Sequence, residues 1–393
     1  MDFKKECENY SMNTYARLPV AFVEGAGMRL WDSEGFEYLD FLAGIATANL
    51  GHAHPAVAEA VCDQAWTLVH TSNLYHIKPQ IELAGRLCGM SFADKAFFCN
   101  SGAEANEGAL KLARRWGHEN KNGASEIIAM EGSFHGRTLF TLSATGQAKF
   151  HKGFEPLVPG VHIVPYNDLK AVEEKINEQT AAVIVEPLQG EGGVIVPAEE
   201  YLSGLREICD KNNVLLIFDE VQTGMGRTGE MFAYQREGVP PDVMTLAKAL
   251  GNGFPIGAVM AKDEVACAFT PGTHAATFGG NFLACRAANA VLDQFEKLNI
   301  VENVKKNGEY FKGRLEETAK ERRIVNEVRG KGLLLGMELS VSGKPVVDYC
   351  MKEGMIINCT ADKVLRFAPP LIVTKEDIDT LVPILDNALR ELE

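Results

Sequence analysis

The 393-residue sequence predicts an α/β fold with a mostly parallel sheet. Short continuous runs of Val, Ile, Leu and Phe alternate with helical segments, which is typical of parallel strands covered by helices on both faces. No internal repeat or low-complexity tract interrupts this alternation. We expect strands at 95–99, 126–130, 161–165, 181–185, 214–218 and 243–246. Helices are expected between several of them, for example at 105–116, 169–177 and 199–212.

The two ends of the chain differ from this central pattern. Residues 27–39 predict a hairpin that turns at 33–35. From about Leu292 onward, long helices mix with short strands such as 332–339. We therefore expect a large α/β domain and a smaller α+β domain built from both chain ends. The predicted segments are an N-terminal segment 1–50, a large domain 51–290 and a C-terminal domain 291–393.

The composition narrows the class of function. Lys and Arg total 39 against 53 Asp and Glu, a net charge of −14. Such an acidic surface repels phosphate backbones and anionic membranes, so we expect no nucleic-acid or membrane partner. No apolar run reaches the ~18 residues of a membrane span, and the N-terminus lacks signal-peptide features. The nine cysteines form no Cys-x-x-Cys pair, which favours a cytoplasmic protein with reduced thiols and no metal.

Asp219 and Lys248 each follow a predicted strand, where ligands bind in parallel sheets. A carboxylate such as Asp219 is costly next to a buried strand unless it meets a cation. Asp219 is therefore either a helix cap or surface acid, or the partner of a cationic ring nitrogen. Lys248 has apolar neighbours and glycines after it, which fits a surface lysine poorly. An amine in such surroundings has a lowered pKa or forms an imine, as Schiff-base chemistry requires.

The segment Asn-Ser-Gly-Ala-Glu after strand 95–99 predicts the start of a helix. Ser101 and Glu104 have the spacing of a capping box. Capping does not exclude a second role, because free amides at a helix N-terminus also hold a phosphate. Gly102 would let that phosphate approach closely.

A second loop, at 132–138, combines an aromatic ring with a cation. Phe134 is either ordinary core or a ring that faces a planar ligand, and Arg137 can bind a carboxylate with two hydrogen bonds. By contrast, His52 and His54 have no third ligand at an obvious spacing, so loop packing is a better interpretation than a metal pair.

Gly224, Gly226 and Gly229 formally match a dinucleotide fingerprint. A true fingerprint directly follows its strand and opens a helix, whereas here five residues intervene after the strand. We predict a tight loop, and an oxidoreductase that uses nicotinamide stays a minor alternative. No phosphate-binding loop of a nucleotide hydrolase is present in the sequence.

Together these segments resemble the class III, or ornithine-type, aminotransferases, which are fold-type I pyridoxal-phosphate enzymes. The resemblance covers nearly the whole chain, from Asn-Thr-Tyr-Ala-Arg at 13–17 to Leu-Arg-Phe-Ala-Pro at 365–369. Its most specific motifs are Asn-Ser-Gly-Ala-Glu-Ala-Asn, Asp-Glu-Val-Gln-Thr-Gly and Leu-Ala-Lys, at 100–106, 219–224 and 246–248.

The resemblance implies pyridoxal 5′-phosphate as cofactor and a role for each motif residue. Lys248 would form the Schiff base, and Asp219 would keep the ring nitrogen protonated so that the ring accepts electrons. Gln222 would reach the ring hydroxyl. The remaining cofactor contacts would be the ring neighbours Val221 and Phe134, the phosphate-binding Ser101, Gly102 and Ala103, and Thr277 reaching the phosphate of a neighbouring subunit. The last contact implies a homodimer.

Within this class the Phe-His-Gly-Arg segment at 134–137 is similar to the acetylornithine-specific branch. The resemblance implies transfer of the terminal amino group of N2-acetyl-L-ornithine to 2-oxoglutarate, in arginine biosynthesis. Arg137 would bind the donor carboxylate, and Arg366 the carboxylate of 2-oxoglutarate. Glu191 would neutralise Arg366 when no dicarboxylate is bound. Succinylornithine, succinyl-diaminopimelate, ornithine and 4-aminobutyrate stay open as donors.

Two positions depart from the family pattern. Ala276 stands where Ser or Thr is usual, which removes a hydroxyl near the substrate. Phe282 replaces a common Pro after Gly-Gly-Asn, which puts the shape of that loop in doubt.

Overall fold

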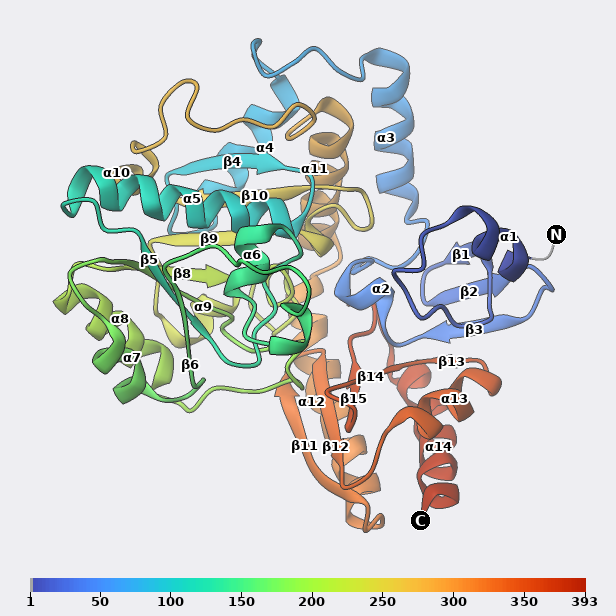
Figure 1. The fold of residues 1–393 in the computed structure, drawn as a ribbon. Helices are drawn as coiled ribbons and strands as arrows, with labels where there is room; N and C mark the ends of the chain where they lie inside the picture. Colours follow the sequence, from blue (N-terminus) through green and yellow to red (C-terminus); the bar gives the residue numbers. More distant parts are fainter. Residues whose placement is uncertain (1–2) are drawn as a thin grey trace.

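A seven-stranded sheet forms the centre of the larger lobe in Figure 1, a computed structural model that describes residues 3–393. The first two residues of the predicted segment 1–50 lie outside this range. The strand order is β4-β10-β9-β8-β7-β5-β6. The strands are β4 (Lys95–Cys99), β5 (Glu126–Met130), β6 (Val161–Val164), β7 (Thr180–Val185), β8 (Leu215–Asp219), β9 (Val243–Leu246) and β10 (Gly257–Ala261).

This sheet confirms the predicted α/β architecture. Strands β5 to β9 pair in parallel, and only β10 runs antiparallel to its two neighbours. Every predicted central strand is present, with ends that shift by no more than one residue. Strand β10 was missed, because its short Gly-Ala-Val-Met-Ala sequence lacks the β-branched run that marks its neighbours.

Both faces of the sheet are buried. Along β8, Leu216 and Phe218 belong to one apolar core, while Leu215 and Ile217 belong to another. Successive side chains of a strand point to opposite faces, so each strand supplies both cores. The helices of this lobe are α5 (Gly102–Asn120), α6 (Leu139–Ala144), α7 (Leu169–Lys175), α8 (Tyr201–Lys211), α9 (Ala233–Glu237) and α10 (Asp263–Ala266).

The N-terminal sheet contains the predicted hairpin and one strand from the far end of the chain. Its order is β1 (Phe22–Ala26), β2 (Arg29–Asp32), β3 (Glu37–Asp40) and β13 (Met355–Ile356). The hairpin between β2 and β3 is stabilised by Asp32, whose carboxylate accepts the amides of Glu34 and Phe36 at 2.9 Å each. Strand β13 pairs in parallel with β3, so both chain ends share one sheet. The domain boundaries themselves stay a prediction.

A second four-stranded sheet belongs to the C-terminal part alone. Its order is β11 (Val325–Lys331), β12 (Leu334–Leu339), β15 (Val364–Phe367) and β14 (Asn358–Thr360). The remaining helices are α1 (Phe3–Tyr10), α2 (Ala43–Ala46), α3 (Pro55–Thr67), α4 (Lys78–Gly89), α11 (Phe282–Lys297), α12 (Ile300–Lys320), α13 (Lys344–Lys352) and α14 (Lys375–Leu392). In the described range, none of the helices has the length and apolar character needed to cross a membrane.

Phe282, which replaces a Pro common in the family, lies at the start of helix α11. The helix begins at Phe282, and the side chain of Asn281 caps it by accepting the amide of Ala284 at 3.0 Å. Proline is common at this first helical position because its fixed φ already suits a helix. Phe282 occupies the same position without changing where the helix begins.

Candidate active site

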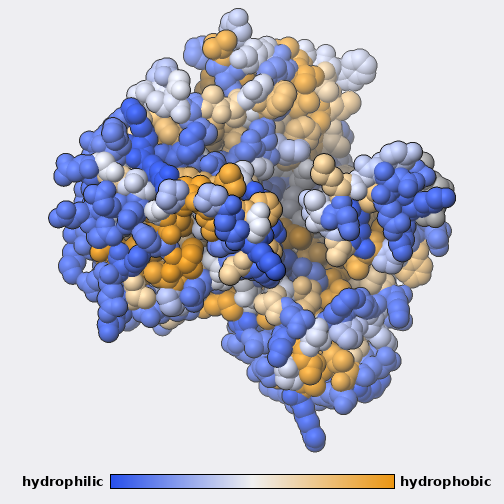
Figure 2. Space-filling model, viewed as in Figure 1, coloured by the Kyte–Doolittle hydropathy of each residue, from blue (hydrophilic) through white to orange (hydrophobic). Residues whose placement is uncertain are grey.

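The carboxyl ends of β4, β5, β7, β8 and β9 meet at one edge of the large sheet, beside the sheets formed by the chain ends. Figure 2 shows that this face of the molecule is hollowed between the lobes. A cavity of about 360 Å³ lies at this edge. Its walls include most predicted site residues: Ser101, Gly102, Ala103, Phe134, Arg137, Glu191, Asp219, Val221, Gln222 and Lys248. Arg366 lies directly behind the wall, and Thr277 is not part of it.

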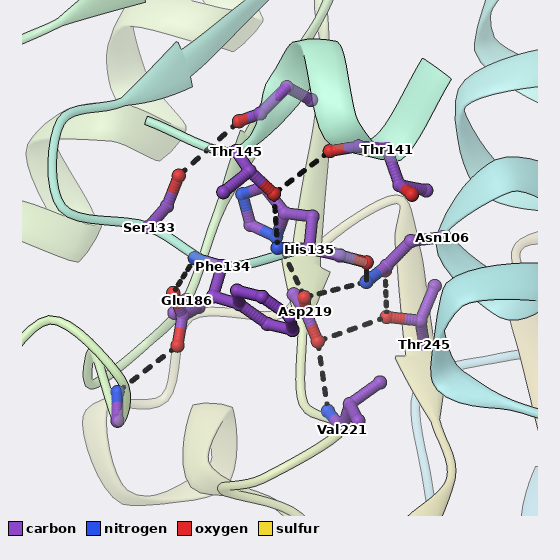
Figure 3. Close-up of polar contacts among 12 residues, drawn as sticks. Asn106, Ser133, Phe134, His135, Thr141, Thr145, Glu186, Asp219, Val221 and Thr245 are labelled. Atoms are coloured by element: carbon purple, nitrogen blue, oxygen red, sulfur yellow. Dashed lines mark hydrogen bonds and ion pairs between the residues drawn. The ribbon is translucent and has the colours of Figure 1, made fainter. Parts of the chain in front are cut away.

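Asp219, at the end of β8, is the centre of a buried hydrogen-bond network (Figure 3). Its Oδ2 accepts from Asn106 Nδ2 and from His135 Nδ1, both at 2.7 Å. Its Oδ1 accepts the backbone amide of Val221 at 3.0 Å. The amide of Asn106 is itself oriented by Thr245, whose hydroxyl donates to it at 2.7 Å. Because donors surround it, the carboxylate is held in one orientation at the cavity wall.

One residue, Ala247, separates the end of β9 from Lys248, which begins a 3₁₀ turn (Lys248–Leu250). Its backbone has a φ of 42°, a conformation that residues other than glycine rarely adopt. Burial lowers the pKa of its amine below the usual value for lysine, although the nearby carboxylate of Glu191 opposes this effect. Within the described part of the chain, its Nζ has no hydrogen-bond partner. The amine is therefore available to a ligand in the cavity.

The start of α5 forms the predicted capping box. Ser101 Oγ accepts the amide of Glu104 at 3.1 Å, and the Glu104 carboxylate accepts the amide of Asn100 at 3.0 Å. The first-turn amides of Gly102 and Ala103 lie on the cavity wall, and among residues 3–393 no acceptor bonds to them. A Cβ at Gly102 would lie 2.7 Å from Val221 Cγ1. Glycine is thus needed at this position for packing, in addition to any ligand.

Phe134 and Val221 both line the cavity and belong to different loops. The backbone amide of Phe134 donates to Glu186 Oε1 at 2.9 Å, and its ring packs edge-on against Phe150 at 5.9 Å. The guanidinium of Arg137 stacks on the same Phe150, 3.9 Å from the ring centroid. Arg137 is exposed and, among residues 3–393, forms no ion pair with an acid. It can therefore bind an anion at the cavity mouth.

Arg366, on β15, is fully buried and differs from Arg137 in its partners. Its Nη1 donates to Glu191 Oε1 at 2.5 Å and to Gln222 Oε1 at 3.3 Å. Burial acts to raise the pKa of Glu191, but the charge and hydrogen bond of Arg366 outweigh it and lower that pKa. The second amino group of Arg366, Nη2, is buried without a hydrogen-bond partner in the described chain. Such an unused donor marks a place where a ligand oxygen could bind.

Thr277 lies on the exposed loop between α10 and α11, away from the cavity of its own chain. The loop is fixed by Asn73, whose Nδ2 donates to the carbonyl oxygens of Ala276 at 3.1 Å and Gly279 at 2.9 Å. Ala276 thus contributes its backbone carbonyl to the loop even though it lacks the hydroxyl usual at that position.

The cavity wall also contains residues that were not singled out from the sequence, among them Asn106, His135 and Glu186. Asn106 and His135 belong to motifs quoted above, yet their partner Asp219 is 113 and 84 positions away in the chain. No local spacing reveals such a pairing. Glu186 follows β7 directly, so its position after a buried strand was the one available signal.

The glycine segment at 224–229 and the histidine pair at 52 and 54 are both explained by packing. A Cβ at Gly226 would lie 2.8 Å from Phe295, so that segment packs against the core and does not form an open phosphate loop. His52 Nε2 lies 2.7 Å from Asp40 Oδ2, which agrees with loop packing. In the described range, no group of three or more His, Cys, Asp or Glu side chains is arranged to hold a metal ion.

Comparisons with known proteins agree with this geometry. The model of the family "Aminotransferase class-III" matches residues 10–389. An acetylornithine aminotransferase of Methanocaldococcus jannaschii is 52% identical over 98% of this chain and 97% of its own length. One of Aquifex aeolicus is 52% identical over 97% of this chain and 100% of its own length.

Solved structures extend the comparison to three dimensions. The ornithine aminotransferase of Toxoplasma gondii superposes with a TM-score of 0.96 at 35% identity, covering 100% of this chain and 95% of that one. The acetylornithine aminotransferase of Elizabethkingia anophelis gives 0.88 at 36% identity, covering 99% and 98%. A second Toxoplasma gondii structure is described with pyridoxal phosphate at its active site. On the family match and these relatives, the chain belongs to the class III aminotransferases.

Proposed function

We propose that this enzyme transfers the terminal amino group of N2-acetyl-L-ornithine to 2-oxoglutarate, with pyridoxal 5′-phosphate as cofactor. The products would be N-acetyl-L-glutamate 5-semialdehyde and L-glutamate. The names of the relatives that are half identical to this chain support the donor. The observation that carries the proposal is the pair of arginines: one cavity has a free Arg137 and an Arg366 neutralised by Glu191.

The residues present fit the cofactor. The free amides of Gly102 and Ala103 suit its phosphate, because helix N-termini attract anions. Asp219 suits a cationic ring nitrogen, Gln222 the ring hydroxyl, and Phe134 and Val221 the two ring faces. When bound, the cofactor supplies an aldehyde that condenses with amines and a ring that accepts electrons from the reacting carbon.

Lys248 supplies the amine and the base of the reaction. Because burial lowers the pKa of its amine, the side chain is more readily neutral and able to bind a carbonyl carbon. When the cofactor holds the donor amine instead, Nζ of Lys248 would be free to remove a proton from the donor carbon that bears the nitrogen. Asp219 would stay in place beside the ring, because its three donors, Asn106, His135 and the amide of Val221, hold it, so no reorganisation is needed between steps.

The two arginines let one cavity accept two unlike substrates in turn. Arg137 binds the single free carboxylate of the acetylated donor, so that the terminal amine reaches Lys248. Glu191 covers the charge of Arg366 during this half-reaction and leaves no second site for a carboxylate. When 2-oxoglutarate arrives, Glu191 moves aside and both amino groups of Arg366 bind its carboxylate. Alternating substrates in this way gives ping-pong kinetics.

A homodimer with shared active sites is part of the proposal. Thr277 is exposed on its own chain, which suits a contact to the cofactor phosphate of a neighbouring subunit. Large apolar side chains are exposed on this loop and on the segment bonded to it: Phe278 is 61% exposed, and Leu74, which follows the loop's partner Asn73, is 87% exposed. Exposed apolar groups of this size commonly mark an interface. The nine cysteines are all free thiols, which fits the cytoplasm as its compartment.

A panel of donors tests the proposal. The visible band of the protein-bound cofactor is followed after adding N-acetylornithine, ornithine, succinylornithine or 4-aminobutyrate without an oxo acid. We expect N-acetylornithine to bleach the band fastest. A faster rate with another amine would reassign the donor and keep the mechanism, whereas a protein that binds no cofactor would overturn both.

A further inference from the structure

Glu186 is a buried carboxylate of the cavity wall that the proposed reaction does not use. It directly follows β7 and is only 5% exposed. Its Oε1 accepts the backbone amide of Phe134 at 2.9 Å, and its Oε2 accepts that of Gly190 at 3.1 Å. Figure 3 shows the carboxylate directed at the amide of Phe134. One side chain therefore joins two loops that are far apart in the sequence.

Each of these loops carries a group that would select a substrate. The first loop, at 131–137, holds Phe134 and Arg137, and the second, at 187–195, holds Glu191 immediately after Gly190. The loops also touch directly, because Gln189 Nε2 donates to the carbonyl oxygen of Glu131 at 2.8 Å. A displacement of either loop at Glu186 would thus move the arginine that binds the donor and the carboxylate that controls the oxo acid.

The chemistry of this link requires a carboxylate. Both oxygens of Glu186 accept backbone N–H groups, which an ionised side chain of this length can satisfy together. A glutamine of the same shape offers one acceptor oxygen and turns an NH2 group toward the other backbone donor. A shorter aspartate keeps the charge but cannot reach both loops. Retaining a charge here is costly, since burial raises the pKa of Glu186 to about 7 even with His135 beside it.

We propose that Glu186 is a positioning residue that fixes the loop of Phe134 and Arg137 to the loop of Glu191, so that one carboxylate sets the binding of both substrates. The identity of those substrates rests on the proposed function. The coupling of the two loops does not, because it follows from the hydrogen bonds of the chain itself.

Amide hydrogen exchange of the purified full-length protein tests the link without any turnover. In Glu186→Gln, we expect segments 131–137 and 188–192 to exchange about tenfold faster than in the parent, because one loop loses its acceptor, the other keeps only a neutral hydrogen bond, and the link between them is broken. Steady-state kinetics should show KM for donor and for 2-oxoglutarate both raised about tenfold, with kcat within about threefold.

Glu220→Gln is the matched control. Glu220 is also fully buried, also has a pKa raised by burial to about 7, and also accepts two backbone amides, those of Ala233 at 2.6 Å and Tyr234 at 2.9 Å. It is not part of the cavity wall. Its variant should loosen α9 and leave both KM values unchanged, which separates positioning from a general loss of stability.

The proposal is overturned if exchange of both loops stays as in the parent, or if only one KM changes. If Glu186→Gln does not fold, Glu186→Asp is measured instead, with the same expected direction in both loops. A protein that prefers another donor, yet shows faster exchange in both loops, would overturn the proposed donor and uphold the role of Glu186.

Discussion

Around Asp219 both carboxylate oxygens have donors, and the donors are themselves oriented by Thr245 and Thr145. Around the two arginines the situation differs: Arg137 has no acid partner in the described chain, and Arg366 keeps one buried amino group unused. The first region suits chemistry that is the same in every half-reaction. The second suits ligands that alternate. The groups around Asp219 are thus fixed in advance, where the proposed reaction needs no rearrangement. The unused hydrogen-bond donors belong to the two arginines, where the proposed substrates would exchange.

The largest effect is expected when the amine of Lys248 is removed. Lys248→Ala should lower multiple-turnover activity by at least about 10⁴-fold, because it removes both the nucleophile and the proton carrier. Steady-state rates with the donor and 2-oxoglutarate measure this loss. Thermal unfolding should show that the variant still folds. Substantial multiple turnover in this variant would contradict the assignment of Lys248.

A smaller effect is expected at Asp219, the proposed partner of the ring nitrogen. Asp219→Asn keeps the size of the side chain and removes its charge, so kcat should fall about 10²- to 10³-fold, as for other preorganised electrostatic groups. Single-turnover bleaching of the cofactor band measures the step directly. Equal rates in the parent and the variant would show that the buried network is structural only.

Arg137→Gln tests whether the two arginines bind different substrates. We expect KM for the acetylated donor to rise about 10- to 100-fold, since a charge-assisted contact to its carboxylate is lost, while KM for 2-oxoglutarate changes little. Arg366→Gln is the counterpart and should reverse the pattern. A parallel rise of both constants in the Arg137 variant would mean that the two arginines do not divide the substrates.

The smallest expected effect concerns pH and stability. Burial raises the pKa of Glu220 from 4.5 to about 7 in the folded protein, so between these values the folded state binds more protons than the unfolded state. The contribution of Glu220 to stability is therefore present at low pH and is lost as the pH rises toward 7. Glu220→Gln should remove this decline, which a Tm series from pH 5 to 8 would detect as a difference of a few degrees. Parallel Tm curves for parent and variant would contradict the raised pKa.

The sequence could predict the features that depend on a local pattern of residues. Lys248, Asp219 and Gly102 stand beside apolar strands or at a helix start, so a local pattern marks each of them. The strands of the large sheet, except β10, were equally visible, because they are short apolar runs buried on both faces. Candidate residues in contiguous motifs could therefore be identified from the sequence alone.

Features that depend on contacts between distant segments were not accessible. The partners of Asp219, the link through Glu186 and the pairing of β13 with β3 arise only when residues far apart in the chain meet. Strand β13 has two residues, too few for any periodicity to identify. Hydrogen bonds between loops leave no spacing signal, because their geometry is set by the fold as a whole.

The parallel pairing of β13 with β3 also has a consequence for the order in which the protein can be made. Residues 37–40 leave the ribosome long before their strand partner at 355–356 is synthesised. The cavity shows the same dependence, since its wall contains residues from Thr47 to Ile256 and is backed by Arg366. Domains generally fold as units during synthesis, and pairings that are distant in sequence form slowly. The hairpin of the N-terminal sheet must therefore keep an open edge until residues 355–356 are available, and a chain that terminates before Arg366 would lack part of the candidate active site.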